Sequence, residues 1–229
     1  MDIESLARHV MDHYAYDYIV LTDHSKSSRI AGGKEEKDFI RQMKEIDRIN
    51  SKLGKAFIKK GVEVDILPDG QLDFSDSLLS KMDWVCASIH AGFRKDNTGR
   101  LVAACQNPYV SCLGHPSGRL IGKREPYKVD WKQVFIAASR TGTAIEINSQ
   151  PDRMDLNDIL ARQAVEAGVM LTISTDSHAA EHFDFMRLGV TVARRAWCEP
   201  KHILNTRPWK EVEAFAKKKR AKLLVHAKA

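Results

Sequence analysis

Six side chains of the kind that bind metal ions stand in, or directly after, short apolar runs of the sequence. They are His24, Glu63, His90, His115, Asp176 and His178. The apolar runs have the length of buried strands, and the carboxyl ends of parallel strands meet at one face of an α/β fold. We therefore expect the six side chains to converge. Burying several ionisable groups together is costly without a cation, which favours a metal site.

Imidazole and carboxylate ligands together favour Zn²⁺, Mn²⁺ or Fe²⁺ over Ca²⁺ or Mg²⁺. A carboxylate such as Glu63 can bridge two ions, and paired ions suit the hydrolysis of phosphate esters. One ion lowers the pKa of a water molecule, and both ions stabilise charge on the phosphoryl oxygens. Each residue alone has a structural interpretation, as a loop histidine or a buried ion-pair partner. The set as a whole predicts a hydrolytic metal centre.

A basic, glycine-containing segment follows one of these histidines. The sequence Gly-His-Pro-Ser-Gly-Arg at 114–119 continues to Gly-Lys-Arg at 122–124. Guanidinium groups bind phosphate oxygens through two parallel hydrogen bonds, so we expect Arg119 and Arg124 to contact an anionic substrate. The alternative is that this segment is a solvated basic loop.

Apolar runs alternate with amphipathic segments along the whole chain, which predicts an α/β fold with a mainly parallel sheet. The expected strands cover residues 18–21, 57–67, 83–89, 110–113, 143–147 and 169–173. The expected helices cover residues 34–53 and 156–167, include residues 134–138, and make up the C-terminal part. The chain shows no repeat or linker, so we expect one domain over residues 1–229.

The composition narrows the class of protein. No apolar run approaches the ~20 residues of a membrane span, and the N-terminus lacks the pattern of a secretory signal. The four cysteines show no Cys-x-x-Cys spacing, which fits a reducing cytoplasm. The formal net charge of +6 owes much to a basic run at 217–222, which is typical of a solvated helix end. We expect a cytoplasmic protein without a membrane partner.

In this order, these motifs resemble the PHP (polymerase and histidinol phosphatase) superfamily, and most closely the C-terminal PHP domain of bacterial family X DNA polymerases. The resemblance covers nearly the whole chain. Its most specific segments are Gly-Val-Glu-Val-Asp-Ile-Leu-Pro-Asp-Gly at 61–70 and Gly-His-Pro-Ser-Gly-Arg at 114–119. Further matching segments are 19–27, 83–90, 146–148 and 174–178.

The resemblance implies a distorted seven-stranded βα barrel that holds up to three metal ions. By matching motif, Glu63, His90 and His115 would form one complete site. Asp176 would share a second ion with Glu63, and the remaining two histidines, His24 and His178, would serve a third. In the polymerases this domain is associated with Mn²⁺-dependent 3′–5′ exonuclease activity.

The chain departs from the family pattern at its start. Family members begin with a strand that carries a His-x-His pair, followed shortly by an Asp or His, whereas this sequence begins at the next helix. We therefore expect an N-terminally truncated barrel without its first strand, with two incomplete metal sites. Strands next to the missing one would have open edges, here at residues 18–21 and 171–174, and open edges invite self-association.

Three functions stay open at this point. The first is a metal-dependent phosphoesterase that acts on nucleic-acid ends, like a 3′–5′ exonuclease. The second is a phosphatase for small molecules of the histidinol-phosphate kind, with the same metals. The third is a non-catalytic metal-binding or accessory domain, which the absent ligands would favour. The expected partners are therefore DNA or a phosphorylated small molecule.

Overall fold

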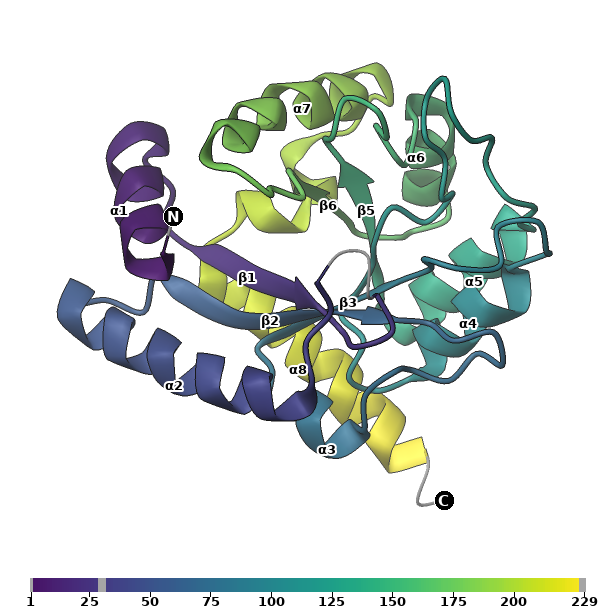
Figure 1. Cartoon of the computed structure of the whole chain (residues 1–229). Coiled ribbons are helices and arrows are strands. Elements are labelled where there is room, and N and C mark those ends of the chain that lie inside the picture. Colours follow the sequence, from purple (N-terminus) through teal and green to yellow (C-terminus); the bar gives the residue numbers. More distant parts are fainter. Residues whose placement is uncertain (1, 29–31, 227–229) are drawn as a thin grey trace.

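The computed structural model describes residues 2–28 and 32–226. Six parallel strands form one sheet in the order β1-β2-β3-β4-β5-β6, so strands that follow one another in the sequence also lie side by side (Figure 1). The strands are β1 (Ile19–His24), β2 (Ile58–Asp65), β3 (Trp84–Ser88), β4 (Cys112–Leu113), β5 (Ala144–Asn148) and β6 (Leu171–Ser174). All six predicted strands are confirmed.

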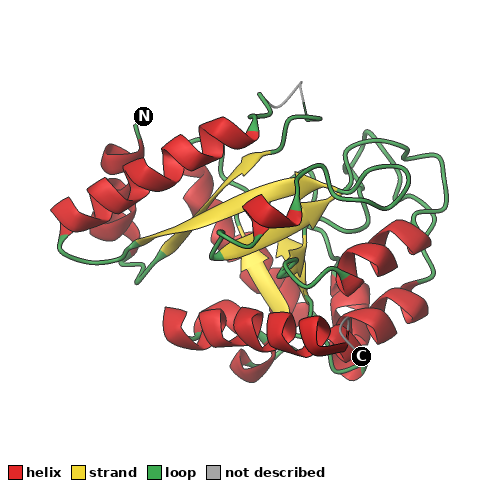
Figure 2. Cartoon of the chain, turned by 90° about the horizontal axis from the view of Figure 1, so that it is seen from below, coloured by secondary structure: helices red, strands yellow, loops and turns green. Residues whose placement is uncertain are grey.

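Helices join the strands and cover the outside of the curled sheet (Figures 1 and 2). They are α1 (Ile3–Tyr14), α2 (Glu36–Leu53), α3 (Asp76–Leu79), α4 (Thr98–Gln106), α5 (Trp131–Thr141), α6 (Asp158–Glu166), α7 (Met186–Arg195) and α8 (Trp209–His226). Three short 3₁₀ segments, η2 (Ala180–Phe185), η3 (Pro200–His202) and η4 (Leu204–Thr206), lie between β6 and α8. The architecture is the predicted distorted α/β barrel, and in the described residues it is an open half-barrel of six strands.

Local sequence signals explain several helix ends. The side chains of Asp2, Asp130 and Asn157 accept hydrogen bonds from backbone N–H groups in the first turns of α1, α5 and α6. Gly54 and Gly142 end α2 and α5 in the left-handed conformation. These residue types are the preferred caps because they satisfy backbone groups that a helix leaves free.

Three clusters of buried apolar residues hold the helices against the sheet. Residues on the helix-facing side of the central strands pack with α4 to α7 in the largest cluster, which includes Val62, Val85 and Ile145. A second cluster packs α1 and α2 against the start of the sheet, around Ile46 and Phe57. A third places α8 beneath the amino ends of the strands. The strand order and these clusters leave the carboxyl ends of the strands free for a site.

The two sheet edges differ. Among the described strands none pairs with the outer edge of β1, as the sequence predicted. On the outer edge of β6, Leu171 forms a bridge with Ile203, and the side-chain amide of Asn205 bonds both the N–H and the C=O of Ile173. The expectation that this edge exposes unpaired backbone is therefore wrong for β6, because a later segment of the chain covers it.

Candidate metal centre

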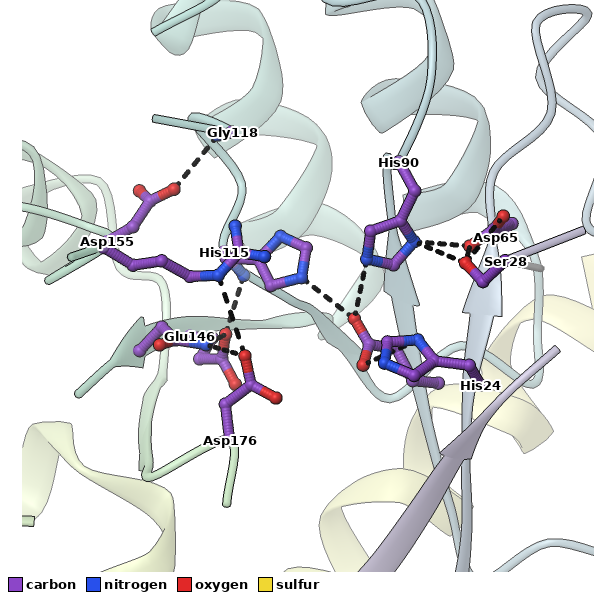
Figure 3. A network of polar contacts seen from close by, with 12 residues as sticks. His24, Ser28, Asp65, His90, His115, Gly118, Glu146, Asp155 and Asp176 are labelled. Atoms are coloured by element: carbon purple, nitrogen blue, oxygen red, sulfur yellow. Dashed lines mark hydrogen bonds and ion pairs between the residues drawn. The ribbon is translucent and has the colours of Figure 1, made fainter. Parts of the chain in front are cut away.

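Three predicted ligands, the histidines His24, His90 and His115 labelled in Figure 3, surround the buried carboxylate of a fourth, Glu63, at the carboxyl ends of the strands. Nε2 of His115 lies 2.9 Å from Oε1 of Glu63, and Nε2 of His90 lies 3.4 Å from the same oxygen. Nδ1 of His24 lies 3.4 Å from Oε2 of Glu63. The parallel register explains the convergence, because His24 pairs with Glu63 across β1 and β2, while His90 and His115 follow β3 and β4.

The electrostatics of Glu63 favour its ionised form. Burial alone would raise the pKa of Glu63, but the hydrogen bond from His115 and the charges of the three histidines hold it well below its usual range. Burial likewise opposes the charged form of His115, whose pKa is nevertheless raised by its hydrogen bond to Glu63. The centre therefore holds a negative oxygen pair facing three imidazole nitrogens.

The donor set fits a cation. Nδ1 of His90 lies 2.5 Å from a carboxylate oxygen of Asp65, so this nitrogen carries the proton. When His90 is neutral, as a metal ligand is, the lone pair of Nε2 faces Glu63, and a positive ion between these two acceptors would stabilise the arrangement. Among the described residues, the buried Nδ1 of His24 also lacks a hydrogen-bond partner. Ligand atoms of His24, Glu63 and His90 all lie within 4.8 Å of one another.

The predicted ligands Asp176 and His178 lie on the turn after β6. Asn148 donates a hydrogen bond of 3.1 Å to Oδ2 of Asp176, and Nε of Arg153 lies 3.7 Å from the same oxygen. The His178 side chain is 60% exposed, and its ring lies 6.1 Å from that of His24. The structure therefore brings His24 close to Glu63 and His90, whereas the resemblance paired His24 with His178. The assignment of ligands to individual ions stays a prediction.

Asp65 is a site residue that the sequence reasoning missed. Its carboxylate accepts hydrogen bonds from His90, Ser27 and Ser28. Burial opposes its negative charge, yet these hydrogen bonds lower the pKa of Asp65. A carboxylate behind a ligating histidine fixes the tautomer and the orientation of the ring. Asp65 stands within the motif at 61–70, two residues after Glu63, and this spacing is the signal that could have found it.

The backbone around His115 is held by two further buried carboxylates that we did not predict. Oε2 of Glu146 accepts the N–H of His115 at 2.7 Å. Oδ2 of Asp155 accepts the N–H groups of Ser117 and Gly118 at 2.9 and 3.0 Å. Burial raises the pKa of Glu146 to about 6. Together they stabilise a loop in which His115 has an unusual positive φ of 27°.

Gly118 is required at this loop. Its φ is 64°, and a Cβ there would lie 2.2 Å from the ring of Tyr127. The Tyr127 hydroxyl in turn donates to the carbonyl of Pro116 at 2.7 Å. The motif at 114–119 therefore has a structural reason, which is the placement of His115 over the sheet.

The structure gives the predicted arginines backbone partners. Arg119 donates to the carbonyl oxygens of Arg153 (2.7 Å from Nε) and Met154. Arg124 donates to the carbonyl of Gly118 at 2.7 Å and lies over the ring of Phe93. Their contact with substrate stays a prediction. Arg153, which the sequence reasoning did not single out, is the guanidinium that reaches Asp176.

Comparisons with known proteins agree with this geometry. The chain is 45% identical over 206 residues to DNA polymerase/3′-5′ exonuclease PolX of Bacillus subtilis. The matched region covers 89% of this chain and 36% of PolX. It is 31% identical over 176 residues to a probable phosphatase of Thermoanaerobacter (strain X514), which covers 71% of the chain and 69% of that relative.

The chain belongs to the PHP superfamily. A solved structure of histidinol phosphate phosphatase from Lactococcus lactis, in complex with zinc, L-histidinol and phosphate, shares the PHP fold with a TM-score of 0.58. That match covers 86% of this chain and 88% of the other at 15% identity. No protein-family model matches the chain. PHP membership confirms the prediction of a metal-dependent hydrolase of the phosphoesterase type.

The chain spans about a third of the length of PolX. In the described part of the chain, no helix has the length and apolar character that crossing a membrane requires.

Proposed function

We propose that this PHP domain hydrolyses phosphodiester bonds at nucleic-acid ends, in the manner of a 3′–5′ exonuclease. The observation that carries the proposal is the buried Glu63 carboxylate surrounded by three imidazoles, one of which is oriented by Asp65. Mn²⁺, Zn²⁺ or Fe²⁺ held by these residues would supply positive charge to phosphoryl oxygens. The similarity to PolX over 89% of the chain supports a nucleic-acid substrate.

The protein's own residues would bind and orient the phosphate. Arg153 is partly buried beside Asp176 and its charge also acts on His115, so its guanidinium can form a bidentate contact with phosphate oxygens at the site. Exposed basic residues Arg94 and Lys95 follow His90, and they can attract the next phosphates of a strand. A row of cations beyond the reacting phosphate is more useful for a polymer than for a small molecule.

Hydrolysis of a small phosphate monoester is the second candidate. Two observations favour it, namely the similarity to probable phosphatases and the fold shared with histidinol phosphate phosphatase.

Turnover of three substrates with added Mn²⁺ separates the candidates. The proposal predicts that a 3′-recessed DNA duplex has a kcat/KM at least about tenfold above those of p-nitrophenyl phosphate and histidinol phosphate, because the extra phosphates add binding energy in the transition state. A preference for either small ester would favour the second candidate. Absence of turnover on all three substrates, with metal bound, would contradict the proposal.

A further inference from the structure

The turn that carries Asp176 and His178 is held mainly by side chains. Nε2 of Gln150 donates to the carbonyl oxygens of Thr175 and Asp176, both at 2.7 Å. Asp176 itself has a φ of 46°, a left-handed conformation that is uncommon outside glycine, although aspartate adopts it more readily than most residues. The conformation of the turn therefore depends on residues outside it.

His182 is the second residue that holds this turn. The backbone N–H of His178 donates to Nδ1 of His182 at 3.2 Å, and Nε2 of Gln150 lies 3.2 Å from the same nitrogen. A backbone N–H can only donate, so Nδ1 of His182 must be unprotonated. Its ring packs on Phe185 with the centroids 5.0 Å apart. The sequence did not single out His182, because these contacts exist only in the folded turn.

The held turn also fixes the tautomer of His178. Nδ1 of His178 lies 2.8 Å from the carbonyl oxygen of Asp176. A carbonyl oxygen can only accept, so Nδ1 carries the proton and Nε2 keeps its lone pair. The same carbonyl is the one that Gln150 holds. A shift of the turn would therefore change both the place of His178 and the nitrogen that it offers.

We propose that His182, together with Gln150, is a positioning residue that presets the Asp176–His178 turn for a divalent ion and the phosphate it binds. The inference rests on the proposed function, because it assigns a task within the same site. The decisive feature is a hydrogen-bond acceptor at the position of Nδ1 in His182. Asparagine offers an acceptor oxygen at the equivalent position along the side chain, whereas phenylalanine keeps the ring against Phe185 and offers none.

Two substitutions at one position therefore form a matched pair. His182→Phe is expected to weaken binding of at least one Mn²⁺ ion by about 10- to 100-fold, the usual effect of losing a group behind a metal ligand. His182→Asn is expected to restore the affinity to within about threefold of the unchanged protein. Mn²⁺ binding is measured by titration calorimetry. In parallel, ¹⁵N NMR of the metal-free protein reports the protonated ring nitrogen of His178, assigned by its loss in His178→Ala.

The two readouts separate failure of this inference from failure of the proposed function. An unchanged protein that binds no Mn²⁺ would contradict the proposed function, while the tautomer of His178 would still test the positioning role. The inference is overturned if His182→Phe keeps both the Nδ1-protonated His178 and the Mn²⁺ affinity, or if His182→Asn behaves like His182→Phe. If His182→Phe is unfolded by circular dichroism, Gln150→Leu takes its place and must show the same two losses.

Discussion

Asp65 and His90 form a hydrogen bond of 2.5 Å that aims the other ring nitrogen of His90 at Glu63. Asp65→Asn should weaken metal binding by about 10- to 100-fold, because an amide holds the ring and its tautomer less firmly than a carboxylate. Titration calorimetry with Mn²⁺ measures the effect. Asp69→Asn, on the exposed turn after β2, is the control and should bind as the unchanged protein does. Equal affinities for the two variants would contradict a role for Asp65.

Glu63→Gln should remove the metal centre. The amide has the size of the carboxylate but no charge, so three imidazoles lose the anion that they face. We expect the melting temperature of the unchanged protein to rise with added Mn²⁺, since a ligand that binds only the native state stabilises it. The melting temperature of Glu63→Gln should not respond. A similar rise in both proteins would place the metal elsewhere.

Arg153 and Arg119 should have different roles, one in phosphate binding and the other in stability. Arg153→Ala should lower kcat/KM by about 10- to 100-fold through lost phosphate binding, with metal content unchanged. Arg119→Ala should lower stability, because its guanidinium holds the backbone that carries Arg153. If Arg119 and Arg124 instead contact substrate phosphate, as the sequence predicts, Arg119→Ala weakens binding of DNA or phosphate without loss of metal. Steady-state kinetics and thermal melts of the alanine variants of Arg153, Arg119 and Arg124 distinguish a role in phosphate binding from a role in stability.

Lys219 should make stability depend on alkaline pH. It is buried beneath the sheet, where Nζ donates to Val110 and Thr143, and burial lowers its pKa to about 8. Between about pH 8 and the ordinary pKa of 10.5, the unfolded chain binds this proton more tightly than the folded chain. The contribution of Lys219 to the free energy of unfolding therefore rises with pH across that window, by up to about 3 kcal/mol. Denaturation at several pH values measures the free energy of unfolding, which should rise more steeply with pH for the unchanged protein than for Lys219→Met. Parallel plots of this free energy against pH for the two proteins would contradict the prediction.

The free edge of β1 should pair with another strand. No described strand covers this edge, and open parallel edges carry unpaired N–H and C=O groups, so we expect the chain to self-associate there. Light scattering should therefore show a dimer or a larger assembly. A monodisperse monomer would contradict this prediction.

The sequence was informative where local pattern and structure agree. Runs of apolar and β-branched residues predicted every strand, and the rule that sites lie at strand ends brought His24, Glu63, His90 and His115 together. Helix α4 was not predicted because it is short and has Gly99 in its first turn, which weakens the helical signal.

Residues that support the site from a distance could not be predicted. Asp65 and His90 are 25 residues apart, and Arg119 reaches Arg153 across 34 residues. Whether a guanidinium faces substrate or a backbone carbonyl depends on such long-range contacts. His182 was not among the predicted site residues for the same reason, since its role comes from the folded turn at His178 rather than from its sequence neighbours.

The most direct test of the account is the Mn²⁺-dependent shortening of a 5′-labelled, 3′-recessed DNA duplex, followed on a sequencing gel. The protein should remove nucleotides one at a time from the 3′ end, and both Glu63→Gln and a chelator should abolish the ladder. Equal ladders from the unchanged protein and from Glu63→Gln would contradict the central claim that the Glu63 centre hydrolyses nucleic-acid ends.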